Sequence, residues 1–217
     1  LRRTVLPVKQ IGCPGLASEE LEKQRGNEVT MIAEMQEITD TNTRKNDLES
    51  YILTMRSNIA EGGKYGDYIK EADRSVFLGM LDKSEDWLYD HLVDGKQVFI
   101  DKLGELKAKG DPAVKRYKEA SRRIEVSESL RDTARSYKAI AQKPGSKYKH
   151  VDKERLKSLE KACEEAIVWL AENLSKQERR AKTEDPVVDC ASIEARTEDI
   201  ARLADAVLEG RHDSAAD

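Results

Sequence analysis

The chain has 217 residues and a formal net charge of −4, with a sequence pI of about 5.6, and 37% of its residues are charged, 38% hydrophobic and 5% aromatic. Such a high charged fraction with few aromatics predicts amphipathic helices with a large surface and a thin core. The acidic balance argues against nucleic-acid binding, and no run is long and apolar enough to span a membrane as a helix.

The cysteines indicate the compartment. Cys13, Cys163 and Cys190 are odd in number, far apart and outside any Cys-x-x-Cys motif, so they predict neither a zinc site nor a disulfide framework. A reducing compartment fits this usage, and we predict a cytoplasmic location. No signal peptide is recognisable. Because the chain begins at Leu1 and not at Met, we expect it to be a piece of a longer protein.

Residues 1–17 are not predicted to be helical. The apolar run near the start is short, extended and interrupted by Pro7, and glycines together with Pro14 then break the chain. Ser18 and the two glutamates that follow it predict the start of a long helix, with the serine hydroxyl as cap and the acids beside the positive end of the helix dipole.

This first helix carries two apolar stripes whose phases differ by roughly 150°, at about 100° per residue. The stripes consist of Leu21, Ile32 and Met35, and of Leu48, Ile52, Met55 and Ile59. Weak helix formers separate them at positions 39–43. One continuous helix would need two different packing partners, and its first stripe, if left open, would favour self-association. The alternative is a break near Asp40 and two separate helices, and the sequence leaves both open.

Glycine and proline divide the rest of the chain into further helices. Glycines at 62, 63 and 66 end the first helix, and the next runs from about Glu71 to Asp90. Gly95 precedes another helix, and the run from Gly110 to Pro112 predicts a stop followed by a new start. That new helix extends to about Gln142. The two remaining helices begin near Asp152 and after the Asp185-Pro186 pair.

We therefore predict an all-α fold, an elongated helical bundle with a long first helix and a short extended N-terminal segment. The predicted organisation is a linker in 1–17, a bundle in 18–142, a loop in 143–151, a C-terminal helical extension in 152–210 and a flexible tail in 211–217.

The most informative positions lie in the second half of the first helix. Asn46, Glu49, Leu53 and Arg56 are spaced by three, four and three residues, so they share a helical face. That face is distinct from the seam formed by the second apolar stripe. From periodicity alone, a solvated surface with one exposed leucine is the simpler interpretation.

The same residues also resemble a known family. The pattern Lys-Asn-x-apolar-Glu-x-Tyr, followed by Met-Arg, which ends at Arg56, is similar to the start of the helical lid in the heat shock protein 110 family, the large relatives of heat shock protein 70 chaperones. Further matching motifs follow in the family's order. They are Ala72-Asp73-Arg74, Trp87-Leu88-Tyr89, the Val98 to Leu106 helix, Glu164 to Leu170 and Asp185-Pro186-Val187-Val188.

The resemblance implies a chaperone lid that binds the nucleotide-binding domain of heat shock protein 70, promotes ADP/ATP exchange and helps to hold unfolded polypeptides. Asn46 and Glu49 match the family's partner-contacting residues, and Leu53 and Arg56 join them because they share the face. The resemblance also implies that residues 1–17 end a substrate-binding β-domain, which the first stripe would cover. ATP would bind only to an N-terminal domain absent from this chain, so we assign this chain no cofactor.

Nothing in the sequence is typical of catalysis, and we predict a protein that is not an enzyme. The three histidines are isolated, and only one Glu-x-x-His occurs, at Glu209, whereas a di-iron bundle needs two. No phosphate-binding loop is present, Cys163 lies on an apolar stripe, and we assign no metal site. The alternative function is a generic spectrin-like scaffold or interaction module, although such a repeat would show sustained heptads that these stripes lack.

Overall fold

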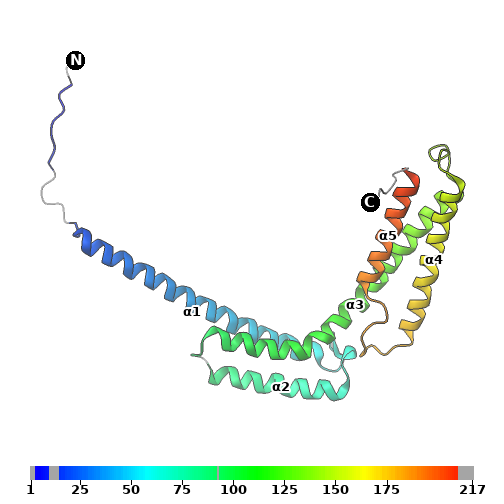
Figure 1. The fold of residues 1–217 in the computed structure, drawn as a ribbon. Helices are drawn as coiled ribbons and strands as arrows, with labels where there is room; N and C mark the ends of the chain where they lie inside the picture. The colour runs from blue at the N-terminus through cyan, green and yellow to red at the C-terminus, as the bar shows by residue number, and fades with distance from the viewer. Residues whose placement is uncertain (1–2, 10–14, 92, 210–217) are drawn as a thin grey trace, which may run out of the picture.

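The computed structural model describes residues 3–9, 15–91 and 93–209. In that part of the chain all regular structure is helical and no strand is present, which confirms the predicted class (Figure 1). The elements are α1 (Ser18–Ile59), η1 (Gly66–Tyr68), α2 (Glu71–Asp90), α3 (Lys96–Gln142), α4 (Lys153–Glu178) and α5 (Cys190–Leu208). None of the described helices is both long and apolar enough to cross a membrane. The breaks predicted at Gly12 and Pro14 and the predicted tail in 211–217 lie outside the described residues.

Helix α1 is continuous through Asp40, so of the two alternatives the single helix is correct. The threonines in the weak segment are accommodated because Thr39 and Thr43 each donate a 2.8 Å hydrogen bond to the carbonyl one turn back. The predicted capping by Ser18 is wrong. Ala17 occupies the cap position, and no side chain caps the helix there.

The two stripes of α1 have opposite environments. The second stripe is buried, whereas Leu21, Ile32 and Met35 are 47%, 61% and 66% exposed. Figure 1 shows why: the first half of α1 projects beyond the other helices, and only its second half packs against α2 and α3. The helix ends at Ile59, and in the turn that follows Gly62 adopts a φ of 76°, a left-handed conformation that favours glycine.

Helix α3 differs from the sequence prediction in its length. The expected stop at Gly110–Pro112 does not occur, and a single helix of 47 residues runs through Pro112. Proline removes a backbone donor and presses on the preceding turn, but packing holds the helix together. Gly110 and Ala113 are buried, and the Tyr51 hydroxyl donates a 3.0 Å hydrogen bond to Asp111. Figure 1 shows α3 changing direction between its two halves, as expected of a helix with an internal proline.

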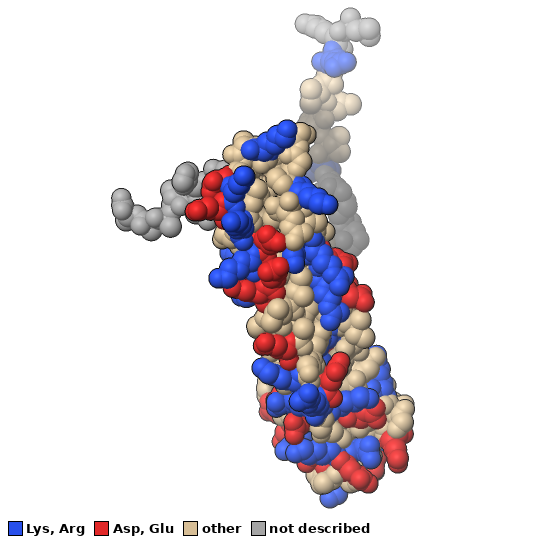
Figure 2. Space-filling model, turned by 90° about the vertical axis from the view of Figure 1, so that its right-hand side faces the viewer, with Lys and Arg blue, Asp and Glu red and all other residues tan. Residues whose placement is uncertain are grey.

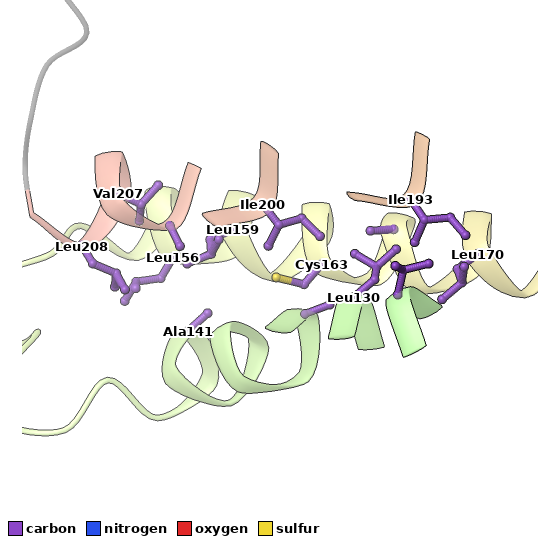
Figure 3. Close-up of a cluster of buried hydrophobic side chains, with 14 of the residues drawn as sticks. Leu130, Ala141, Leu156, Leu159, Cys163, Leu170, Ile193, Ile200, Val207 and Leu208 are labelled. Atoms are coloured by element: carbon purple, nitrogen blue, oxygen red, sulfur yellow. The ribbon is translucent and has the colours of Figure 1, made fainter. Parts of the chain in front are cut away.

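Two hydrophobic cores lie along α3. The first joins the second half of α1, α2 and the first half of α3, and contains Leu48, Ile52, Met55, Ile59, Ile69, Phe77, Leu81, Leu88, Phe99, Leu106 and Ala113. The second joins the second half of α3 to α4 and α5 (Figure 3) and includes Leu130, Leu159, Cys163, Leu170, Ile193 and Ile200. The change from one core to the other falls between Val114 and Val126, inside α3, whereas we placed the division after Gln142.

Polar contacts join the two bundles at this point. Arg116 Nε lies 3.0 Å from Asp185 in the α4–α5 connection, and Arg116 Nη1 donates to the Tyr68 carbonyl at 3.2 Å. Lys182 Nζ lies 2.9 Å from Asp67 Oδ2. Tyr68 also packs edge-on against Tyr117 with ring centroids 5.5 Å apart. The short η1 helix is therefore tied both to α3 and to the α4–α5 connection.

The open stripe of α1 leads to a first prediction. An apolar face on a projecting helix favours association between copies, so light scattering should show a mass that rises with protein concentration. Ile32→Glu with Met35→Glu should reduce that rise, because both side chains lie on the stripe and more than half of each is exposed. Glu34→Gln is the control, since it changes an exposed neighbour outside the stripe. A strict monomer at every concentration would contradict the prediction.

Candidate functional site

The predicted face lies on the outer side of α1, opposite the first core. Asn46 and Glu49 are exposed, and Leu53 is 49% exposed. On the other side of the same turns, Leu48 and Ile52 are 0% and 1% exposed. The phase difference inferred from the sequence is therefore present, and one helix supplies both a packing seam and an outward surface.

Asn46 and Glu49 make no hydrogen bond or ion pair with the rest of the described chain. Their neighbours differ: Arg44 Nη1 lies 3.1 Å from Asp47 Oδ2, and Tyr51 reaches across to Asp111. Partial burial and, secondarily, the Asp111 carboxylate raise the pKa of Tyr51 above its ordinary value. The amide of Asn46 and the carboxylate of Glu49 thus keep their full hydrogen-bonding capacity for another molecule.

Arg56 differs from the other three residues of the face. Its guanidinium hydrogen-bonds to Glu85, and its Nε lies 3.1 Å from Asp82 Oδ1, both on α2. The hydrogen bond to Glu85 is the main cause that raises the pKa of Arg56. The structure therefore places Arg56 at the edge of the face, where it joins α1 to α2, and leaves the other three side chains unengaged. The α1 outer face is hereafter Asn46, Glu49 and Leu53, with Arg56 at its border.

Charge is finely mixed on one side of the molecule. Figure 2 shows basic and acidic side chains interleaved over the side of the molecule that it displays. A surface of this kind does not form the single-sign field that steers phosphate-rich ligands. Within the described ranges, no three His, Cys, Asp or Glu side chains gather as potential metal ligands. Cys163 and Cys190 are both buried and free, and burial raises the pKa of each thiol.

Comparison with known proteins finds relatives along most of the chain. A family model described as HYOU1-like, C-terminal domain matches residues 133–209, which cover the end of α3 together with α4 and α5. Heat shock 70 kDa protein 15 of Arabidopsis thaliana is 32% identical over 199 residues, or 91% of this chain and 24% of that protein. Heat shock 70 kDa protein 4 of Homo sapiens is 34% identical over 178 residues, and that of Rattus norvegicus 31% over 186. These cover 80% and 84% of the chain, and 21% and 22% of the relatives.

The chain belongs to the heat shock protein 110 family. It spans about a quarter of the length of the curated relatives that it matches. No solved structure matches it significantly. The resemblance inferred from ordered motifs is thus confirmed, and the matched region of this heat shock protein 110 relative folds as two bundles that share α3.

Sequence reasoning missed a second group of polar side chains, on α3 of this heat shock protein 110 relative. Arg123, Ser127 and Arg131 follow one another at intervals of four residues and line one cavity. A signal was present, since a serine beside Val126 falls among the apolar positions of the second core. The cavity itself depends on where the α4–α5 connection returns, which local periodicity does not reveal.

Proposed function

We propose that this chain binds the nucleotide-binding domain of a heat shock protein 70 through the α1 outer face, and so promotes exchange of ADP for ATP. One observation carries the proposal. Asn46, Glu49 and Leu53 are exposed and unengaged, on the helix whose other side anchors the first core. Membership of a chaperone family supports the choice of partner.

The chemistry of the face suits a protein partner. Leu53 supplies an apolar centre, and the amide and carboxylate beside it supply polar contacts at its edge, the arrangement of an interface hot spot. The face is held in place because Arg56 and Tyr51 fix α1 to α2 and α3. Exchange follows only if the chain prefers the open form of its partner, since a ligand shifts an equilibrium by its differential affinity for the two states.

The remaining parts of the proposal concern clients and compartment. The exposed stripe of α1, with Ile32 and Met35, would help to hold unfolded polypeptides, since an open apolar face binds apolar segments. The role proposed is that of a binding surface and not of a catalyst, with no metal or cofactor in this chain and with no part for nucleic acid or membrane. ATP would belong to a domain outside it. We place the chain in the cytoplasm because of its cysteine usage.

The test is binding of the 217-residue chain to a purified heat shock protein 70 nucleotide-binding domain by calorimetry, with and without ADP. Asn46→Tyr, Glu49→Ala and Leu53→Ala should each weaken binding. A hydrogen bond to a charged group contributes roughly 1.5–3 kcal/mol, so loss of Glu49 should lower the affinity about ten-fold or more. Melting temperatures should stay unchanged, because surface substitutions alter stability by about 0.5 kcal/mol or less.

Two control variants lie on the same helix. Asn27→Tyr and Glu34→Ala make the same kinds of change at exposed positions away from the face and should leave binding intact. Release of labelled ADP from heat shock protein 70 should follow the same order of variants as binding does. No binding by the unaltered chain would favour the alternative, a generic helical scaffold. Lost binding with a collapsed melting temperature would show that these side chains stabilise the fold instead.

A further inference from the structure

A cavity of about 420 Å³ lies where the two bundles meet. Its walls come from Tyr68 of η1, from the middle of α3, from Leu174 near the end of α4 and from Pro186 in the α4–α5 connection. The volume falls within the range of clefts that hold small ligands or parts of larger ones. The ion pairs Arg116–Asp185 and Lys182–Asp67 fasten these walls to one another, so the cavity is built from elements held together in the folded chain.

The inner wall carries a ladder of three polar side chains. Arg123, Ser127 and Arg131 are spaced by four residues on α3, so neighbouring members lie about one turn, or roughly 6 Å, apart along the helix axis. Ser127 therefore lies between the two arginines along the helix axis. We call this set the α3 polar ladder.

Ser127 is the most unusual member of the ladder. It is only 3% exposed, and its hydroxyl has no hydrogen-bond partner in the described structure. Ser84, buried to the same degree in α2, donates instead to the Met80 carbonyl at 2.7 Å. A buried hydroxyl without a partner is unfavourable and calls for an explanation. Ser127 is one of the residues that line the cavity, so a ligand bound between the neighbouring arginines would supply the partner that this hydroxyl lacks.

The two arginines are also unengaged. Neither Arg123 nor Arg131 forms an ion pair or hydrogen bond with the described residues, both are half-buried, and Arg123 Nε is a second buried donor without a partner. The other cations of the lining, Arg116, Arg180 and Lys182, each pair with a carboxylate. The unpaired acids of the lining, Glu128 and Glu178, are exposed, where water screens their charge. The interior of the cavity thus offers positive charge and donors.

From this arrangement we propose that the cavity binds a peptide segment whose acidic residues alternate with apolar ones. Guanidinium groups match carboxylates through paired hydrogen bonds, and the Ser127 hydroxyl adds a donor between them. Carboxylates two residues apart on an extended peptide recur every 6.6 Å or so on one side, close to the spacing of the ladder. Apolar side chains of the peptide would contact Ile124 and Leu174, which line the same cavity.

The site is separate from the α1 outer face, so its test needs no heat shock protein 70. The probe is a fluorescein-labelled peptide, Glu-Leu-Glu-Leu-Glu, titrated with the full 217-residue chain while fluorescence anisotropy is recorded. The affinity for Gln-Leu-Gln-Leu-Gln should be lower by about ten-fold or more, because this peptide lacks the carboxylates. Arg123→Gln combined with Arg131→Gln should lower the affinity for the acidic peptide by a similar factor. Arg135→Gln, which alters an exposed arginine of α3 paired with Asp132, should leave binding unchanged.

Ser127→Ala separates a ligand site from a structural role. Removal of an unpaired buried hydroxyl should leave the melting temperature unchanged or raise it, while affinity for the acidic peptide falls a few-fold. A lowered melting temperature with unchanged affinity would overturn the proposal. The proposal would also be overturned if the chain bound the glutamine peptide as tightly as the acidic one. It would be overturned as well if the double arginine variant bound the acidic peptide as tightly as the unaltered chain does. A last measurement is competition with inorganic phosphate. If phosphate displaces the peptide at concentrations where acetate does not, the cavity is a phosphate site and the assignment to carboxylates fails.

Discussion

Gly110→Ala is expected to destabilise the protein, although alanine is the better helix former. An added Cβ at this position would lie 2.5 Å from Tyr51 Oη, 2.8 Å from Met55 Cε and 2.8 Å from Phe77 Cζ. Met55 and Phe77 are buried and Tyr51 is partly buried beside them, and forcing extra atoms into such a site costs typically about 1–3 kcal/mol. The better helix propensity of alanine stabilises the folded state by about 1 kcal/mol at most. Chemical unfolding should therefore show a net loss of stability.

Gly104→Ala is the matched control for that result. Gly104 lies in the same helix but is exposed, and a Cβ there would meet nothing within 4 Å. The same substitution should stabilise the chain by roughly 0.5–1 kcal/mol. If both variants shift the unfolding midpoint in the same direction, then Gly110 is not a point of close helix contact, and the packing of α1 and α2 against α3 is incorrectly described.

Leu159→Ala should have the largest effect in the second bundle. Leu159 is 0% exposed and lies among the residues of α3, α4 and α5 in the second core (Figure 3). Truncating a buried leucine removes packing and leaves a cavity, at a cost of about 2–5 kcal/mol. For a chain of this size each kcal/mol lowers the melting temperature by about 2–4 °C, so calorimetry would detect the change readily.

Val168→Ala tests whether that loss comes from burial. Val168 lies on the same helix but is 55% exposed, so its truncation should change stability by about 0.5 kcal/mol or less. Equal losses from the two variants would mean that α4 does not present the Leu159 side to α3 and α5.

Periodicity predicted most of the helices because each one buries a single stripe. The boundaries of α2, the end of α3 and the start of α4 all follow from glycines, prolines and apolar spacing. The sequence failed at Gly110–Pro112, where two residues that normally end a helix are overridden by contacts with Tyr51 and Phe77. Those partners are far away in sequence, so no local pattern could have shown them.

The candidate site was predictable to a similar extent. That Asn46 and Glu49 point away from the core follows from the phase of the seam, and the structure agrees. The pairing of Arg56 with Glu85 was not predictable, because it depends on how α2 lies against α1. The α3 polar ladder was missed for the same kind of reason: its cavity is completed by the α4–α5 connection, which lies where the two bundles meet but is distant from the ladder in sequence.

Because α3 is continuous, the number of helical residues between the two cores fixes how one bundle is rotated and displaced relative to the other. Between Val114 of the first core and Val126 of the second, the link is helix and not a loop, so it absorbs no change in length. One inserted residue would turn the second bundle by about 100° and move it by about 1.5 Å relative to the first. The contacts of Arg116 with Asp185 and of Lys182 with Asp67 would then be out of phase. Insertions that the loop at 143–151 would tolerate are therefore excluded from this part of α3.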